Sequence, residues 1–283
     1  MITMVVLTYC RGGVALDLLD SLTELDHRMI SEIIVVDNND ERIWPDGYFV
    51  GKYRDKVSVI ADGRNSGVGG GRNRAIEQAA NSDFLFVDDD CILGDLTAAY
   101  SFIEPGNFAG LINVQVEKDN GDLRPNEIPR PKELALAHAA VPANVCYVIG
   151  ACFFAIGLTK KEVLFNDRYN PYGFEEIALS FRTIASGRPV VSVTKTSTRH
   201  LKSENGRIAG LNQQQSINKF YIVGRYYPLT NLVLTTTAYL IRAPSNARAI
   251  IIGLRQGFSD RLSGEVKMTA RYLRRIGLSS RLI

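Results

Sequence analysis

Residues 2–90 alternate short apolar runs with segments of helical periodicity, and this alternation constrains the fold more than any other feature. The run ITMVVLT at 2–8 is apolar or β-branched at every position, as in a strand covered on both faces of a parallel sheet. EIIVVDNND, KVSVIAD and DFLFVDDD repeat the pattern. Helical periodicity falls between them, at 14–25 and after a glycine-rich turn at 66–71. The order predicts an α/β fold with a Rossmann-like, mostly parallel sheet flanked by helices.

Polar residues follow each predicted strand. Open α/β sheets bind ligands in the crevice at the carboxyl ends of their strands, so recurring polar residues there indicate a binding site. The residues in question are Thr8, Tyr9, Asp37, Asp62, Asp88, Asp89 and Asp90.

The three consecutive aspartates are the most informative of these. Neighbouring carboxylates repel unless a cation or a donor offsets their charge, and Mg²⁺ and Mn²⁺ prefer oxygen ligands. On an extended strand Asp88 and Asp90 share a face while Asp89 points elsewhere. We therefore expect a Mn²⁺ or Mg²⁺ site at Asp88 and Asp90. The alternative interpretation is a solvated acidic turn.

The glycine-rich stretch DGRNSGVGGGRNRA, residues 62–75, has features that favour binding of an anion. It lacks the dinucleotide-binding fingerprint, because it follows a later strand and ends on Arg. A helix N-terminus with Arg72 and Arg74 nearby still favours a phosphate. A flexible turn with arginines on a helix face is the alternative.

A second acidic pair opens the helix predicted from Phe174 to Ser186. Glu175 or Glu176 could act as a general base, or both could simply stabilise the first helical turn. His200 follows a predicted strand and could complete the metal site with a neutral imidazole, or serve a structural role.

The chain carries its positive charge at the C-terminal end. Residues 206–283 hold twelve Lys and Arg against two acidic residues, a net charge of +10, whereas residues 1–205 carry −7. Helices are expected near 212–227, 229–242 and 259–276. The segments LTNLVLTTTAYLI and RLSGEVKMTARYLRR favour contact with an anionic membrane surface. The alternatives are a helical subdomain packed on the core and a homo-oligomer contact. Nucleic acid is not expected, because the basic residues are dispersed among aliphatic ones.

The cysteines and the hydropathy of the sequence indicate where in the cell the protein is located. Cys10, Cys91, Cys146 and Cys152 have no metal-ligand spacing and are expected to be reduced thiols. No run reaches the about 18 apolar residues needed to span a bilayer, and the N-terminus does not have the pattern of a signal peptide. We expect a cytoplasmic protein that is peripheral on the inner face of the cell membrane.

Taken in order, these features resemble the inverting family 2 glycosyltransferases of GT-A fold, including the rhamnosyltransferase-like bacterial members. The resemblance covers about residues 2–205. It rests on six stretches and His200: VVLTYCRGG, EIIVVDNND, NSGVGGGRNRAIEQA, FLFVDDDC, GACFFAI and FNDRYNPYGFEEIALSFRTIASG. It implies a catalytic domain at 1–205, with a nucleotide-binding half at 1–106 and an acceptor half at 107–205. Residues 206–283 would form a basic helical extension.

The resemblance also implies roles for individual residues. In the DxD motif, Asp88 would lie near the ribose and Asp90 would bind the metal, with His200 as a further metal ligand. The donor nucleotide would contact Thr8, Tyr9, Arg11, Asp37, Asp62, Arg72, Asp88 and Asp89. The sugar or acceptor pocket would include Gly150, Ala151 and Tyr172.

The family's catalytic Glu-Asp pair corresponds to Glu175-Glu176, so Glu176 replaces the Asp that usually acts as base. The expected function is metal-dependent, inverting transfer from a nucleotide-diphosphate sugar to a hydroxyl of a saccharide or lipid-linked acceptor, in bacterial cell-surface polysaccharide synthesis. An inactive nucleotide-binding scaffold of the same fold is the alternative.

Overall fold

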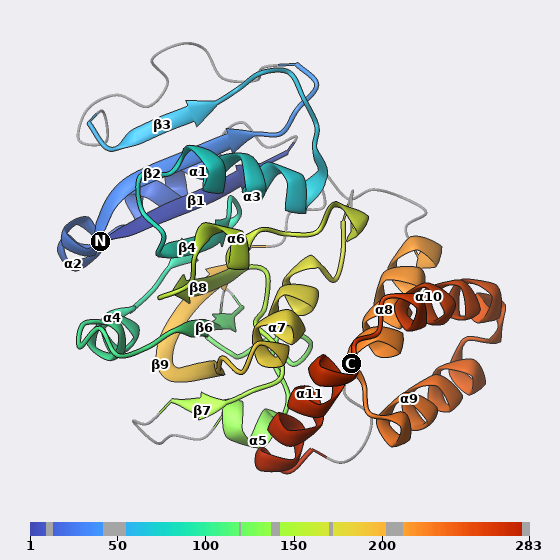
Figure 1. Ribbon diagram of the computed structural model, residues 1–283. Coiled ribbons are helices and arrows are strands. Elements are labelled where there is room, and N and C mark those ends of the chain that lie inside the picture. The colour runs from blue at the N-terminus through green and yellow to red at the C-terminus, as the bar shows by residue number, and fades with distance from the viewer. Residues whose placement is uncertain are drawn as a thin grey trace.

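A computed structural model describes residues 1–9, 14–41, 55–118, 120–136, 142–169, 172–201 and 212–278. In these residues a nine-stranded sheet has the order β3-β2-β1-β4-β8-β6-β9-β5, with β7 paired to β9 (Figure 1). The strands are β1 (Ile2–Thr8), β2 (Ile30–Asp37), β3 (Val57–Ile60), β4 (Phe84–Asp88), β5 (Cys91–Leu93), β6 (Gly110–Glu117), β7 (Ala143–Asn144), β8 (Cys152–Ile156) and β9 (Val190–His200).

The first four strands in this order are wholly parallel, as their apolar runs predicted. β1 lies between β2 and β4, and all seven of its residues are buried. Thr8 pairs with Asp37 across β1 and β2, and Leu7 pairs with Asp88 across β1 and β4. The polar residues that end these strands therefore gather at one edge of the sheet.

The second half of the sheet is mixed. β8 runs antiparallel between β4 and β6, whereas β6 and β9 are parallel. The short β5 pairs antiparallel with the end of β9, so that Cys91 lies opposite His200. This pairing brings the end of a strand late in the chain beside the aspartates at 88–90.

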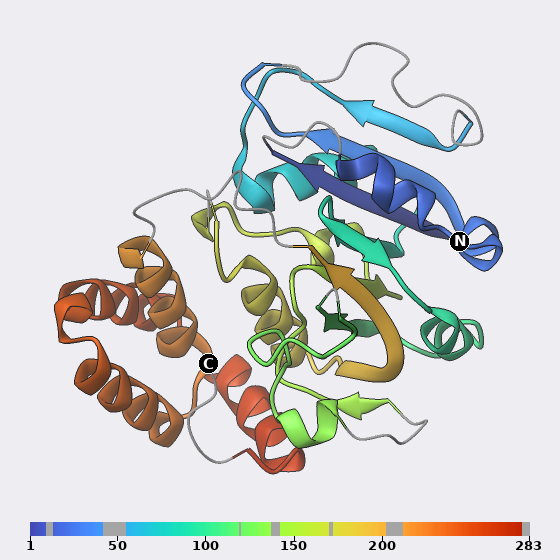
Figure 2. The same ribbon diagram turned by 180° about the vertical axis from the view of Figure 1, so that it is seen from behind.

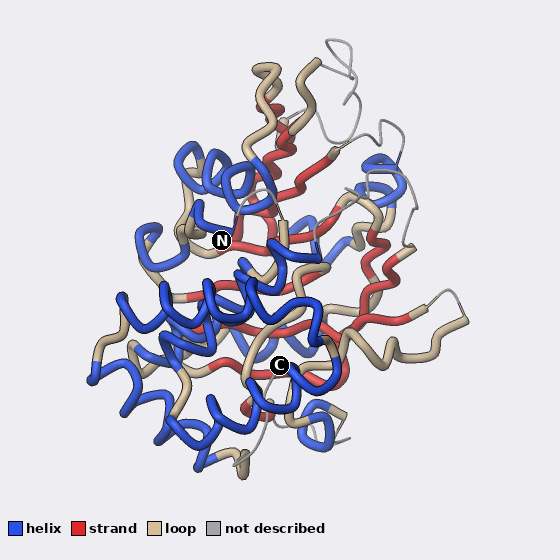
Figure 3. Tube along the Cα trace, turned by 90° about the vertical axis from the view of Figure 1, so that its right-hand side faces the viewer, coloured by secondary structure: helices blue, strands red, loops and turns tan. Residues whose placement is uncertain are grey.

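Helices cover both faces of the sheet, which confirms the predicted α/β architecture (Figure 3). One hydrophobic core contains Leu18 and Tyr100, and the other contains Ile76 and Leu179. The helices are α1 (Val14–Asp20), α2 (Glu24–Met29), α3 (Gly67–Gln78), α4 (Thr97–Ile103), α5 (Lys132–Ala135), α6 (Lys160–Val163), the 3-10 helix η2 (Asp167–Tyr169) and α7 (Glu175–Ala185).

The single helix predicted over 14–25 is two helices. Thr23 has extended backbone dihedrals and begins α2 as its N-cap. Its hydroxyl accepts a hydrogen bond from the Asp26 amide at 3.2 Å, and the Asp26 carboxylate accepts one from the Thr23 amide at 2.8 Å. This capping box stops the first helix, because the cap residue cannot have helical dihedrals.

The C-terminal helices lie to one side of the sheet (Figures 1 and 2). They are α8 (Asn212–Tyr226), α9 (Leu229–Arg242), the 3-10 helix η3 (Pro244–Asn246), α10 (Ala247–Ser259) and α11 (Ser263–Arg275). The sequence prediction missed α10. Side chains at Gly253 and Gly257 would clash with backbone oxygens of α8, so these glycines let the two helices approach closely.

The last helix, α11, packs on α7, which lies against the sheet. Leu273 and Ile276 are buried in a core that also contains Phe181 of α7. The Tyr272 hydroxyl donates to the Val190 carbonyl at 2.6 Å. The packed-subdomain interpretation is therefore right for α11. No helix among the described residues is long and apolar enough to span a membrane.

Three of the four cysteines lie in the described part of the chain. Cys91, Cys146 and Cys152 are buried free thiols, and burial raises the pKa of each of them. They behave as small hydrophobic side chains rather than as reactive groups.

Candidate active site

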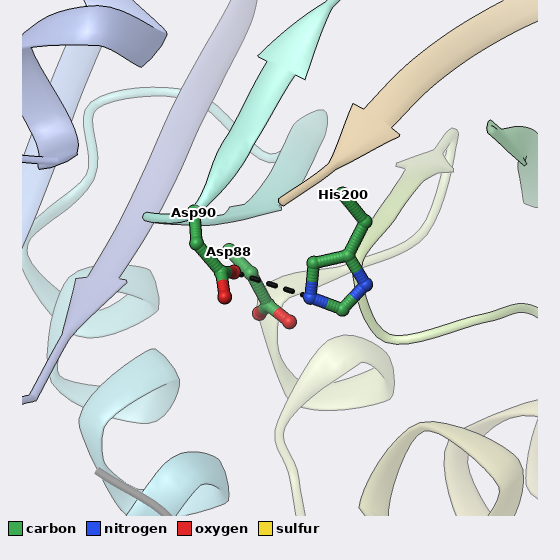
Figure 4. A group of neighbouring side chains, drawn as sticks. All are labelled: Asp88, Asp90 and His200. Atoms are coloured by element: carbon green, nitrogen blue, oxygen red, sulfur yellow. Dashed lines mark ion pairs between the residues drawn. The ribbon is translucent and has the colours of Figure 1, made fainter. Parts of the chain in front are cut away.

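Two aspartates and a histidine meet where β4, β5 and β9 come together (Figure 4). One ligand atom each of Asp88, Asp90 and His200 lies within 4.8 Å of the others. The His200 Nε2 is 3.2 Å from Asp90 Oδ1, and the Leu201 amide donates to the Asp90 carbonyl at 2.8 Å. Two carboxylates with one imidazole form a donor set that fits a divalent cation.

The local geometry differs from the expected strand alternation. β4 ends at Asp88, and Asp89 and Asp90 form the turn that leads into β5. The turn, rather than a shared strand face, brings Asp90 back toward Asp88. Asp89 is buried and stands outside the three-residue group.

Two carboxylates flank the imidazole of His200. Nδ1 is 3.2 Å from Glu127 Oε2, on the side opposite Asp90. Burial lowers the pKa of His200, but the hydrogen bonds to Asp90 and Glu127 outweigh this and raise the pKa to about 9. Glu127 also fixes which ring nitrogen faces Asp90, as carboxylates beside metal-binding histidines do.

Arg72 of α3 is buried and joins this group to the rest of the site. Its side chain is 2% exposed, and Nη2 donates to Asp88 Oδ1 at 2.8 Å and to the Gly150 carbonyl at 2.9 Å. Nη1 lies 3.8 Å from Glu175 Oε1. We expected Arg72 beside the nucleotide or its phosphates, but here it is the counter-ion of two carboxylates.

Three aromatic rings surround the guanidinium of Arg72. Its central carbon lies 5.5–5.9 Å from the ring centroids of Phe86, Phe153 and Phe165. An arginine stacks well on aromatic faces because it is weakly hydrated. This enclosure keeps water away and strengthens the ion pairs that Arg72 makes.

The acidic pair begins α7 after a left-handed turn. Gly173 has a φ of 106° and Phe174 a φ of 73°, so the chain turns sharply before the helix. The buried Glu175 accepts a hydrogen bond from the Gly173 amide at 2.8 Å. Asn218 of α8 donates to the Gly173 carbonyl at 3.0 Å and so ties this turn to the C-terminal helices.

Glu176 is partly exposed and lies against Gly150, where an added Cβ would be 3.5 Å from the Glu176 carboxyl carbon. Burial of the carboxyl group and the neighbouring Glu175 raise the pKa of Glu176 to about 8. Burial also raises the pKa of Glu175, and Arg72 offsets part of that rise. A pair that served only to stabilise a helix terminus would be solvated and fully ionised. The surroundings therefore favour general-base chemistry, with Glu176 as the less engaged member.

The residues expected at the nucleotide lie at the carboxyl edge of the parallel strands. Thr8 and Asp37 are buried at the ends of β1 and β2, and Tyr9 follows β1. Asp37 accepts hydrogen bonds from the backbone and side-chain amides of Asn39. Arg11 lies outside the described residues.

Asp62 has a half-exposed side chain and forms an ion pair with Arg74, at the rim of the same edge. Asn38 was not predicted as a site residue. Its side chain accepts from the Ser66 amide at 2.9 Å and donates to the Gly67 carbonyl at 3.1 Å. It fastens the start of α3 to β2, and only its place after a strand hinted at this role.

Of the three residues expected in the sugar or acceptor pocket, two have backbone contacts within the site. The Gly150 carbonyl accepts a hydrogen bond from Arg72, and the Ala151 carbonyl accepts one from the Asp88 amide at 2.9 Å. Tyr172 is 48% exposed and directly precedes the turn into α7. The structure brings Gly150 beside Glu176 and leaves Tyr172 at the surface near the acidic pair.

Sequence reasoning also missed Glu127 and Arg124. Both come from the turn-rich segment before α5, and Arg124 donates to the carbonyl of His200. Its Nε lies 3.9 Å from Glu127 Oε2. Their segment shows no periodicity, so the sequence held no signal that they reach the end of β9.

Replacement of Arg72 by Met is expected to lower the free energy of unfolding by about 3 kcal/mol, because it removes the cation that pairs with Asp88 and with the buried Glu175. The measurement is urea unfolding followed by circular dichroism. Arg74→Met is the matched control, since its ion pair with the half-exposed Asp62 should contribute less than about 1 kcal/mol. Equal losses in the two variants would contradict the role given to Arg72.

Comparison with solved structures identifies the fold. The chain aligns over 98% of its length with 56% of the GalNAc-T7 chain crystallised with UDP, GalNAc and Mn²⁺, at 12% identity and a TM-score of 0.66. It also aligns over 98% of its length with 92% of S. aureus TarS 1-349 in complex with UDP-GlcNAc, at 16% identity and a TM-score of 0.58. The chain thus spans just over half the length of the GalNAc-T7 chain. These likenesses confirm the expected GT-A fold.

A third similar structure is the mannosyltransferase PcManGT from Pyrobaculum calidifontis in complex with GDP-Man and Mn²⁺. The match covers 99% of this chain and 76% of that one, at 14% identity and a TM-score of 0.53. No curated protein is significantly similar to this chain in sequence. The family model described as Glycosyl transferase family 2 matches residues 3–164, more than half of the chain. The chain therefore belongs to glycosyl transferase family 2.

Proposed function

We propose that the chain is a metal-dependent, inverting glycosyltransferase that moves a sugar from a nucleotide-diphosphate sugar to a hydroxyl group of a saccharide or lipid-linked acceptor. One observation carries this proposal. The buried Arg72 binds Asp88, the Gly150 carbonyl and Glu175 together. The group of Asp88, Asp90 and His200 and the acidic pair therefore belong to one site, as a single-displacement reaction requires.

The residues divide the chemistry between them. Asp90, Asp88 and His200 would hold Mn²⁺ or Mg²⁺, which supplies positive charge to the diphosphate leaving group. Glu176 accepts the proton of the acceptor hydroxyl as its oxygen bonds to the anomeric carbon. The bond from that carbon to the diphosphate breaks in the same step, so the configuration inverts. Glu175 and Arg72 fix the position and the charge of this base.

The similar structures support a nucleotide-sugar donor. They are complexes with UDP and GalNAc, with UDP-GlcNAc, and with GDP-Man, and two of them also contain Mn²⁺. The base and the sugar are set by pocket shape, which these distant likenesses do not determine. A thermal-shift screen of UDP-, dTDP- and GDP-sugars with Mn²⁺ tests the proposal, because a ligand that binds the native state raises the melting temperature.

The cellular role is part of the same proposal. We propose that the enzyme acts in bacterial cell-surface polysaccharide synthesis as one of the rhamnosyltransferase-like members. We also propose that it lies in the cytoplasm at the inner face of the membrane and forms a homo-oligomer. Release of the sugar from the screened donor with Mn²⁺, with or without acceptor, distinguishes an enzyme from an inactive scaffold. A donor that binds but is never hydrolysed or transferred would favour the scaffold.

Glu127→Gln is expected to weaken Mn²⁺ binding about 10-fold or more, because carboxylates that orient a metal-binding histidine typically contribute this much. The measurement is a Mn²⁺ titration by calorimetry. Glu133→Gln, at an exposed position in α5, is the matched control. Equal Mn²⁺ affinity in both variants would remove Glu127 from this role.

A further inference from the structure

The outer face of α9 is apolar and exposed. Five large apolar residues on this 14-residue helix are between 37% and 77% exposed: Leu229, Val233, Leu234, Leu240 and Ile241. Spacings of four and seven residues put them on one side of the helix. The helix has no charged residue before Arg242. Large apolar side chains exposed together on one side of a helix mark a contact with something other than water.

The opposite side of α9 is firmly attached to the protein. Leu232 and Thr235 are buried, and the ring of Tyr239 packs edge-on against Phe220 of α8 with a centroid distance of 5.3 Å. The Lys219 ammonium lies 4.0 Å from the centroid of the Tyr239 ring. The apolar outer face is thus not a core face that has failed to pack, because α9 already has its core contact.

The charges around α9 narrow the choice of partner. Seven charged residues of the described tail are exposed, and all are basic: Arg242, Arg248, Arg255, Lys267, Arg271, Arg274 and Arg275. The two acidic residues are partly buried and engaged. Asp260 accepts from the Tyr221 hydroxyl at 2.7 Å, and Glu265 pairs with Arg225 at 3.2 Å. The tail therefore presents positive charge together with an apolar face.

We infer that the outer face of α9 lies in the interface of an anionic lipid bilayer. Its apolar side chains enter the acyl boundary, while Arg242 and Arg248 at the end of the helix and just beyond contact the headgroups. A second copy of the chain would bring like charges together, and a nucleic acid would leave the apolar face uncovered. The sequence suggested both 229–241 and 261–275 for membrane contact, but α11 uses its apolar side to pack on α7, which leaves the α9 segment.

This inference is independent of the sugar-transfer reaction. Val233→Gln combined with Ile241→Gln makes the centre and the end of the apolar face polar. Both positions are exposed, so the fold should be unaffected. In flotation with vesicles of phosphatidylcholine and phosphatidylglycerol, the double variant should bind about 10-fold or more weakly than the wild type. Leu134→Gln, at an exposed leucine of α5, is the control and should bind like the wild type. Circular dichroism verifies that all three proteins are folded.

The arginines are tested separately. Arg242→Gln with Arg248→Gln should weaken binding to the anionic vesicles about fivefold for each residue, and should have little effect on the weaker binding to phosphatidylcholine alone. Equal vesicle binding by wild type and Val233→Gln/Ile241→Gln would overturn the inference, as would no binding by the wild type. A dimer, detected by light scattering, that the apolar variant dissociates would assign the face to a second copy instead. Loss of oligonucleotide binding in that variant, without vesicle binding, would assign it to nucleic acid.

Discussion

Glu176→Gln is expected to lower the turnover number about 10²-fold or more and to leave donor binding close to that of the wild type. The amide keeps the size of the side chain but cannot accept the proton of the acceptor hydroxyl. Donor affinity should be retained, because Glu176 is not a member of the group formed by Asp88, Asp90 and His200. Initial rates at saturating donor and acceptor, with a separate donor titration, measure the two effects.

Glu175→Gln separates the two members of the acidic pair. Glu175 is buried and accepts from the Gly173 amide, a hydrogen bond that the glutamine oxygen can still accept. We expect a smaller loss of turnover from this variant than from Glu176→Gln. The reverse order would move the base from Glu176 to Glu175, and near wild-type turnover in both would remove the pair from catalysis.

The pH profile tests the same assignment. A base works only when it is deprotonated, and burial together with Glu175 raises the pKa of Glu176 to about 8. Arg72 lowers that pKa, whereas Asp88 raises it further. The value of kcat/KM should therefore fall as pH decreases below about 8, and should level off above it. The residual activity of Glu176→Gln should lack this dependence.

Asp90→Asn should reduce turnover about 10³-fold, which corresponds to the several kcal/mol of charge stabilisation that a bound cation supplies. Asp90 is buried and faces His200, and its replacement would leave Asp88 as the one carboxylate of the three-residue group. Mn²⁺ titrations of activity and of binding by calorimetry measure the loss, and chelation by EDTA should abolish wild-type activity reversibly.

Asp89→Asn is the matched variant for Asp90→Asn. Asp89 belongs to the same turn and is equally buried, but it stands outside the group formed with His200. We expect a much smaller change in Mn²⁺ affinity. If Asp89→Asn impaired Mn²⁺ binding and Asp90→Asn did not, the metal group would have been assigned to the wrong aspartate.

Local patterns were sufficient to predict the parallel half of the sheet. Up to Asp88 at the end of β4, every residue of β1 and β4 is apolar or β-branched, so the burial of both faces could be predicted from the sequence. The polar residues that end these strands then had to meet at one edge, because parallel strands share direction. The place of Asp88 in the site follows from this geometry.

Long-range pairing could not be predicted in the same way. Cys91 lies opposite His200 because β5 pairs with the end of β9, and nothing local to either strand sets that register. Glu127 reaches His200 from a segment without periodicity. The burial of Arg72 depends on Phe86, Phe153 and Phe165, which come from three separate parts of the chain. Such contacts arise from the assembled fold.

The hydrogen bond from Asn218 to the Gly173 carbonyl sets a lower limit on the length of a working enzyme. The family match ends at residue 164, before the acidic pair, and the turn that holds the pair is tied to α8. α11 in turn packs against α7. A fragment trimmed to the matched region would lose the proposed base, and one trimmed before α8 would keep it on an unsupported turn. Truncated variants and chimaeras should therefore retain the helices through α11.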